Sequence, residues 1–210
     1  MLIDNKSLGL LDYLHVQIKW LLKRFLDLNL VWVSRRQLGP ATTPPNLVRT
    51  QISSYEMLKP HLEKPAYGFD EGVVSRSFTR GDICVATFQN DRLAAYSWVR
   101  YKPVETSGGV WVDFSPVHRY NVWGYTHPDF RGRHIRGSFG ALNELDREHE
   151  ITHTISCIDT HNFSSLKAEA RHGGEFVGLA GHVRLFGRIF TFRSPGVKRY
   201  GFKFRYSAPI

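Results

Sequence analysis

The fold is decided by the stretch Thr126-His127-Pro128-Asp129-Phe130-Arg131-Gly132-Arg133-His134-Ile135-Arg136-Gly137. An apolar run before it, residues 119–126, predicts a β-strand, and an amphipathic run after it, residues 133–149, predicts a helix. A tight, glycine-containing turn at such a junction directs main-chain N–H groups at an anion, which the helix dipole also attracts. The three arginines add positive charge. The stretch therefore predicts a phosphate site, and a surface turn with solvated arginines is the alternative.

The segments around this stretch alternate between strand-like and helix-like patterns. Helices are predicted at residues 54–62 and 164–172, with a further short helix within 63–79. Asn90-Asp91 predicts the turn of a hairpin. Strands are predicted at residues 47–52, 83–88, 93–99, 151–158 and 176–192, the last being a hairpin, with an edge strand at 200–206. Such interleaving predicts an α/β (α+β) fold, a mixed sheet with helices on its faces.

The N-terminal part has a pattern of its own. Residues 8–28 place apolar side chains at helical spacing, which predicts an amphipathic helix. After a strand-like run at 30–33, the Pro-rich residues 39–45 can neither continue a helix nor enter a central strand. We therefore predict an N-terminal helix and Pro-rich linker over 1–45 and a globular domain over 46–210. We expect the helix to dock on the domain or on a second subunit in a homodimer, and binding to an anionic membrane surface is the less favoured alternative.

Composition limits the functional classes. The 210 residues include 28 Lys and Arg against 19 Asp and Glu, a formal charge of +9, which favours an acidic partner such as a phosphate, a cofactor or a carrier protein. Two cysteines cannot build a disulfide framework and are expected to be reduced core thiols. The N-terminus does not resemble a signal peptide. We expect a cytoplasmic protein, with the inner face of the membrane as an alternative location.

The quoted stretch resembles the acyl-CoA-binding motif of the GNAT acyltransferases, in which Pro-x-aromatic-Arg-Gly-basic-Gly-Ile-Gly follows the fourth strand. The matching residues are Pro128, Phe130, Arg131, Gly132, Arg133 and Ile135. A later segment, in which a strand ends at Asn162 and a helix runs to Gly173, is similar to a second family element, with Ser165 at its small-residue position. The resemblance covers residues 47–192. It implies a GNAT-like mixed, mostly antiparallel sheet of six to seven strands with helices on both faces.

The resemblance implies an acyltransferase that moves an acyl group, expected to be acetyl, from acyl-CoA to a small primary amine by direct attack. The residues expected to bind the donor are Thr126, Arg131, Gly132, Arg133, His134, Ile135, Arg136, Gly137, Asn162 and Ser165. The predicted catalytic residues are Tyr125, His127 and Glu169. The main-chain N–H that would stabilise the oxyanion is expected at Tyr125 or Thr126, and candidates for the general base are Glu105, Asp113, His118 and His127.

Three departures from the family pattern keep alternatives open. His134 and Arg136 stand where the family has glycines, and Glu169 stands where it often has a tyrosine acid. A long-chain N-acyltransferase that takes its donor from acyl carrier protein is one alternative, and a non-catalytic GNAT-shaped binding module is another. No metal is expected, because no compact His/Cys spacing occurs. Nucleic acid is not expected either, because the basic and aromatic residues of the C-terminal tail alternate as in a strand with one buried face.

Overall fold

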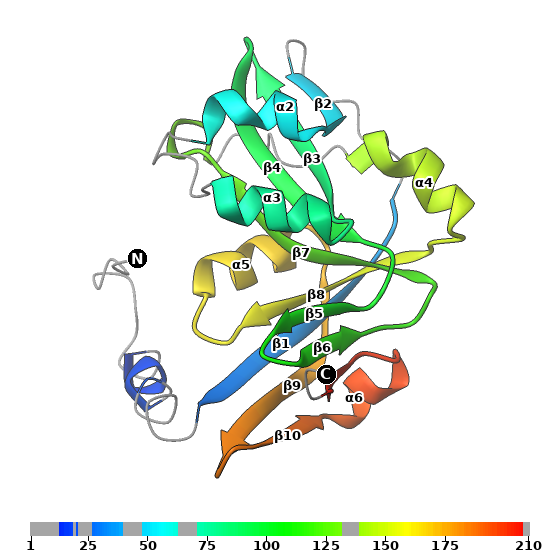
Figure 1. Cartoon of the computed structure of the whole chain (residues 1–210). Coiled ribbons are helices and arrows are strands. Elements are labelled where there is room, and N and C mark those ends of the chain that lie inside the picture. Colours follow the sequence, from blue (N-terminus) through cyan, green and yellow to red (C-terminus); the bar gives the residue numbers. More distant parts are fainter. Residues whose placement is uncertain are drawn as a thin grey trace. The chain divides into compact units, whose positions relative to one another are not determined.

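The structure is a computed structural model that describes residues 13–18, 20, 27–39, 48–62, 71–131 and 139–207. Eight strands form one sheet in the order β10-β9-β1-β8-β7-β4-β3-β2 (Figure 1). The described pairs are antiparallel except β7 with β8, which is parallel. The strands are β1 (Leu28–Gln37), β2 (Val48–Ser53), β3 (Ile83–Gln89), β4 (Arg92–Arg100), β7 (His118–Thr126), β8 (His153–Asp159), β9 (Glu175–Leu185) and β10 (Arg188–Arg193). This confirms the predicted mixed, mostly antiparallel sheet, although the predicted number of six to seven strands was too low.

The chain forms two compact units, each built from separate segments. The first, here called the motif unit, consists of Gln37–Lys102 and Pro116–Ser156 and contains the stretch that begins at Thr126. The second, here called the α5 unit, consists of Met1–Arg36, Pro103–Ser115 and Cys157–Ile210.

Helices cover both faces of the strands in the motif unit. On one face, Leu58 of α2 (Tyr55–Leu58) and Val74 of α3 (Glu71–Thr79) pack against Trp98 of β4. The 3-10 turn η2 (Lys59–His61) follows α2 directly. On the other face, Val85 and Val99 contact Leu142, the last residue of η5 (Phe139–Leu142), which leads into α4 (Asn143–Glu148). The alternation of side chains along a strand separates the two cores. Helices on both faces of the sheet were predicted from the sequence.

A buried ion pair fixes β7 to α4. Arg119 in β7 is completely buried, and its guanidinium pairs with the carboxylate of Asp146 in α4. The hydroxyl of Tyr101 donates to the same carboxylate over 2.9 Å. Burial, followed by this hydrogen bond, raises the pKa of Tyr101 above its usual value. These contacts therefore hold the start of β7 against α4.

The α5 unit takes a strand from the N-terminal part of the chain. β1 pairs antiparallel with β9, with Leu30 opposite Gly181 and Trp32 opposite Leu179. Val33 of β1 is completely buried. The sheet therefore includes residues that precede the predicted boundary between 45 and 46, and the strand-like run at 30–33 extends over Leu28–Gln37. The Pro-rich residues beyond it, 40–47, lie outside the described part of the chain.

The α5 unit also contains two features that the sequence did not predict. The loop expected around Pro103 and Gly108-Gly109 is a hairpin, β5 (Val104–Ser107) and β6 (Val110–Asp113). A short helix, α6 (Pro195–Arg199), precedes the tail. The tail forms β11 (Lys203–Tyr206), an edge strand as predicted, in a three-stranded sheet of order β11-β6-β5.

The remaining predicted elements that the structure describes are found close to their expected places, and the first six residues of the helix predicted over 133–149 lie outside the described residues. Asn90 and Asp91 form the hairpin turn with φ values of 50° and 58°, which asparagine and aspartate tolerate better than most residues. Of the predicted helix over 8–28, residues 13–18 and 20 are helical, whereas Leu28 already belongs to β1 and most of the rest lies outside the described residues. Among the residues that the structure describes, no helix has the length and apolarity needed to cross a bilayer.

Candidate functional site

The end of β7 presents one main-chain edge away from β4. The N–H of His127 donates to the oxygen of Ala94 in β4 over 2.9 Å, and Thr126 lies opposite Ala95. Successive residues of a strand direct their N–H and C=O groups to opposite edges. The N–H and C=O of Tyr125 therefore point toward β4, and those of Thr126 point away from it.

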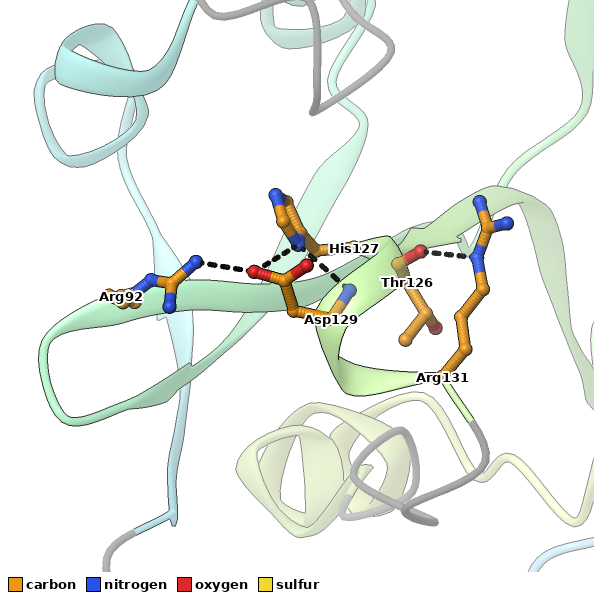
Figure 2. Close-up of polar contacts among 5 residues, drawn as sticks. All are labelled: Arg92, Thr126, His127, Asp129 and Arg131. Atoms are coloured by element: carbon orange, nitrogen blue, oxygen red, sulfur yellow. Dashed lines mark hydrogen bonds and ion pairs between the residues drawn. The ribbon is translucent and has the colours of Figure 1, made fainter.

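The side chain of Arg131 lies along the edge of β7 toward which the N–H and C=O of Thr126 point. Its Nε donates to the carbonyl oxygen of Thr126 over 3.2 Å, as Figure 2 shows. Its guanidinium carbon also lies 5.7 Å from the centre of the Tyr125 ring. The side chain is exposed, so the charge remains open to solvent and to ligands. The sequence-predicted residues Tyr125, Thr126 and Arg131 are thus brought together in the motif unit.

A short 3-10 turn, η4 (Pro128–Phe130), holds the chain between β7 and Arg131. Phe130 is buried and packs on Ala94, while Asp129 forms an ion pair of 2.9 Å with Arg92 (Figure 2). The guanidinium of Arg92 also lies over the Phe130 ring at 5.2 Å. Arg92 was not among the predicted site residues. Its role here is to fix the turn, and the match of Phe130 to the family motif is explained by its burial beneath that turn.

His127 is buried and caps this turn. Its Nδ1 accepts the N–H of Asp129 over 3.3 Å (Figure 2). A ring nitrogen that accepts a hydrogen bond carries no hydrogen, so a neutral ring in this arrangement carries its hydrogen on Nε2. The ring also packs edge-to-face on Phe130 at 5.8 Å between centroids. The same Nδ1 also lies 3.8 Å from Oδ2 of Asp129, and the predicted catalytic role of His127 stays a prediction.

In the α5 unit, Asn162 caps the helix α5 (Phe163–Arg171). Its Oδ1 accepts the N–H of Ser165 over 3.2 Å and the hydroxyl of Ser164 over 3.0 Å. The oxygen is therefore committed to the helix end, and Nδ2 is the atom of this side chain that suits donation to a ligand. Gly173, with φ of 79°, follows the helix as the sequence predicted.

Glu169 lies two turns along α5 and connects the helix to β1. Its Oε1 accepts the hydroxyl of Ser34, a completely buried residue, over 3.0 Å. Gly174 is close to the same carboxylate, and a Cβ added there would lie 2.6 Å from Glu169 Oε1. This contact gives Glu169 a structural role in place of the tyrosine acid of the family pattern. Its predicted catalytic role stays a prediction.

The other candidate bases have structural partners. Asp113 pairs with Arg205 at 3.0 Å and with Lys203 at 3.6 Å in the three-stranded sheet. The carboxylate of Glu105 accepts the N–H of Gly109 over 2.8 Å in the β5–β6 hairpin. His118 is buried at the start of β7, with its ring 5.9 Å from that of His153. The role of each as a general base stays a prediction.

Several predicted site residues lie outside the described part of the chain. They are Gly132, Arg133, His134, Ile135, Arg136 and Gly137. Their predicted role in binding the donor stays a prediction. Within the described residues, no group of three or more His, Cys, Asp or Glu side chains is arranged to hold a metal ion.

Comparisons with known proteins address the fold. No protein-family model matches the sequence. No curated protein matches it. A tandem GNAT protein from the clavulanic acid biosynthesis pathway, solved without AcCoA, superimposes with a TM-score of 0.50 at 14% identity, covering 88% of this chain and 55% of that one. This chain therefore spans about half the length of the tandem protein.

Two further solved structures are similar to this chain. A conserved protein of unknown function from Staphylococcus epidermidis gives a TM-score of 0.52 at 11% identity, covering 85% of this chain and 68% of that one. An aminoglycoside N-acetyltransferase in complex with CoA gives 0.48 at 14% identity, covering 75% of this chain and 99% of that one. At these identities the likeness concerns the fold. The superposition on the tandem GNAT protein shows that the chain has a GNAT-like fold.

Proposed function

We propose that the protein transfers an acyl group from acyl-CoA to a primary amine. One observation carries the proposal: at the end of β7, the Thr126 N–H and the Arg131 guanidinium share the edge that faces away from β4. A main-chain N–H can stabilise the carbonyl oxygen of a thioester. A fixed positive charge at the same strand end can bind the phosphates of acyl-CoA. The GNAT-like fold and the motif match at Pro128, Phe130 and Arg131 support the same assignment.

The proposed chemistry is direct attack without a covalent enzyme intermediate. The neutral amine nitrogen forms a bond to the thioester carbon, the carbonyl oxygen becomes an oxyanion, and the C–S bond then breaks to release the CoA thiolate. The amine proton passes to the thiolate or to solvent. We assign oxyanion stabilisation to the Thr126 N–H, because the Tyr125 N–H points toward β4.

The donor's phosphates are assigned to Arg131 and to the predicted loop that follows it. Arg131 is already positioned by Thr126 and Tyr125, so little conformational entropy is lost when it binds an anion. Asn162 is assigned to an amide of the pantetheine arm through Nδ2, and Ser165 supports it through the helix cap. Each neutral hydrogen bond of this kind contributes about 1 kcal/mol.

Calorimetric titration with CoA tests the donor site. We expect wild-type protein to bind CoA and the variant Arg131→Glu/Arg133→Glu to bind at least tenfold more weakly, since a charge-assisted bond contributes about 1.5–3 kcal/mol. The matched control is Lys102→Glu/Arg188→Glu, which makes the same change in net charge at two exposed residues. If both double variants bind like wild type, the site lies elsewhere, and if wild type binds no CoA, the donor assignment is wrong.

Turnover is tested with acetyl-CoA and octanoyl-CoA against a panel of primary amines, with release of the CoA thiol as the signal. Amine-dependent thiol release supports the enzyme. CoA binding without thiol release for any amine supports the non-catalytic binding module instead. The Arg131→Glu/Arg133→Glu variant is the negative control for the signal.

A further inference from the structure

The hairpin of β9 and β10 ends in a turn that exposes a large apolar side chain. The turn is Phe186-Gly187, between Leu185 at the end of β9 and Arg188 at the start of β10, and Phe186 is 95% exposed. Both turn residues have positive φ values, 49° and 73°. Asparagine, aspartate or glycine usually occupies the first position of such a turn, because a bulky residue is strained there. Neither the backbone nor packing within the described chain therefore favours a phenylalanine at this place.

An apolar surface continues from this turn along one face of three strands of the α5 unit, β10, β9 and β1 (Figure 1). In the strand register Phe190 lies opposite Val183, and Val183 lies opposite Leu28. Residues that lie opposite one another share a face, and so do alternate residues of one strand. Phe190 is 53% exposed and Phe192 is 41% exposed, whereas the other members of this surface are half-buried. We call it the three-strand face, and its members are Leu28, Leu30, Trp32, Leu179, Val183, Phe190 and Phe192.

The N-terminal helix adds apolar side chains on the same side of these strands. His15 lines a hollow of about 340 Å³ together with three residues of the three-strand face, so the helix lies beside that face. Leu14 and Ile18 are four residues apart and therefore share one side of the helix. Both are exposed, and so is Trp20. The apolar exposure thus extends from the strands to the helix within one unit.

Positive charge is concentrated in the same unit as this apolar exposure. The α5 unit contains 15 Lys and Arg against 8 Asp and Glu, whereas the motif unit contains 13 against 11. Arg184 and Arg188 flank the exposed turn, and Arg184 also pairs with Asp27 over 3.3 Å. Of the 11 large hydrophobic residues that are exposed in the described part of the chain, nine belong to the α5 unit. A partner of this unit should therefore be both negatively charged and apolar.

We propose that the α5 unit binds the surface of an anionic lipid bilayer, with the turn at Phe186 inserted into the interface. Apolar side chains enter the boundary of the acyl region there, while arginine side chains keep their guanidinium groups among the headgroups. Each basic residue close to an anionic surface adds to the attraction. The sequence alone favoured docking of the N-terminal helix on the protein, and the exposed hairpin turn is the observation that favours the membrane. The inference does not depend on the proposed acyl transfer.

Two other occupants fit the surface less well. A second copy of this chain would bring together two units that both carry an excess of positive charge, and these repel one another. Single-stranded nucleic acid stacks its bases on aromatic rings, but it offers no apolar phase to aliphatic side chains such as Leu14 and Ile18. A bilayer with anionic headgroups matches both the charge and the aliphatic side chains.

Co-sedimentation of the full-length protein with lipid vesicles tests the proposal. Phosphatidylcholine vesicles with about 30% phosphatidylserine represent the anionic surface, and vesicles of pure phosphatidylcholine represent the neutral one. We expect binding to the anionic vesicles and at least tenfold weaker binding to the neutral ones. Added salt should weaken the binding to anionic vesicles, because it screens the attraction. Binding that is absent from both kinds of vesicle, or equal on both, would overturn the proposal.

Phe186→Asn separates lipid binding from folding. Asparagine is favoured at this position of the turn, so the melting temperature should stay the same or rise. We expect the affinity for anionic vesicles to fall about tenfold, the effect of burying one large apolar side chain less. The matched control is Val117→Asn, which makes a similar change at an exposed apolar turn residue of the motif unit. Wild-type affinity in Phe186→Asn, or an equal loss in Val117→Asn, would overturn the proposal.

Charge and the other two occupants are tested on the same protein. Arg188→Glu should lower the affinity for anionic vesicles at least fivefold, and the exposed Arg76→Glu on α3 is its control. Equal losses in the two variants would overturn the proposal. Sedimentation velocity and titration with a single-stranded oligonucleotide address the remaining occupants. A protein that binds no vesicles but forms a dimer that Phe186→Asn dissociates, or that binds only the oligonucleotide, would also overturn it.

Discussion

The Nε of Arg131 and the carbonyl oxygen of Thr126 lie 3.2 Å apart, so an arginine five residues beyond Thr126 returns to the main chain of β7. The contact places a positive charge at the edge of β7 toward which the Thr126 N–H also points. It depends on the planar guanidinium, which can donate from Nε while its terminal nitrogens face a ligand.

Arg131→Lys should therefore weaken CoA binding although it keeps the charge. Lysine has a single nitrogen and cannot bond Thr126 and a phosphate in the same geometry, so we expect about a tenfold higher Kd, the value of one charge-assisted bond. The exposed position predicts an unchanged melting temperature. Isothermal titration measures the Kd, and Arg188→Lys on β10 is the control. Wild-type affinity in Arg131→Lys would show that charge alone matters there.

Replacements of Asn162 should separate helix capping from donor binding. Asn162→Ala removes both the Oδ1 cap and the Nδ2 donor, and loss of the cap costs about 1 kcal/mol of stability. Asn162→Ser keeps a capping oxygen, so it should unfold near the wild-type temperature while losing CoA affinity about fivefold, one neutral hydrogen bond. Thermal unfolding and CoA titration of both variants check this. A serine variant with full CoA affinity would remove Asn162 from the donor site.

β1 should prove necessary for stability. Val33 is completely buried in β1, and Val33→Ala removes two methyl groups, which predicts a loss of about 2 kcal/mol in the free energy of unfolding. The exposed Gln37 ends the same strand, and Gln37→Ala should change stability by less than about 0.5 kcal/mol. Urea unfolding measures both. Equal effects would mean that β1 is a dispensable appendage.

His182 in β9 should make the protein less stable in mild acid. Burial lowers its pKa below the ordinary value of 6.5, so the unfolded chain takes up the proton first as the pH falls. The stability from a neutral His182 is fully present above pH 6.5 and decreases as the pH falls from there toward the lower pKa of the folded state. Melting temperatures between pH 7.5 and 5.5 should fall more steeply for wild type than for His182→Gln. Parallel slopes would contradict this assignment.

The sequence predicted those features that depend on local chemistry. The turn at Asn90-Asp91, the helix that begins close to residue 54 and the strand that ends at Thr126 depend on neighbours a few residues away, and all three are present. The hairpin of β5 and β6 was missed because its strands have four residues each, and Gly108-Gly109 alone resembles a loop. The five-residue helix α6 starts at Pro195, and it is too short for a periodic pattern.

The features that the sequence could not predict depend on contacts between distant residues. The Ser34–Glu169 hydrogen bond joins positions 135 residues apart, so Glu169 appeared as a substitution in a catalytic pattern rather than as a link between α5 and β1. The Arg92–Asp129 pair likewise links the β3–β4 hairpin to the turn after β7. Nothing in the sequence of α5 indicated the hollow of about 340 Å³ beside this helix, because three of the seven described residues that line it belong to β1 and β9.

The pairing of β1 with β9 also sets the order in which the protein can be completed during synthesis. Leu28 pairs with Val183 and Arg35 with Glu175, so β1 leaves the ribosome 140 to 155 residues ahead of the strand with which it pairs. Contacts of such long sequence separation slow folding, since the closure entropy of a large loop is lost before the contacts form. Until β9 emerges, β1 has an unpaired edge that can pair with other chains. Expression yield should therefore respond more to translation speed and chaperone supply than to the strength of the finished core.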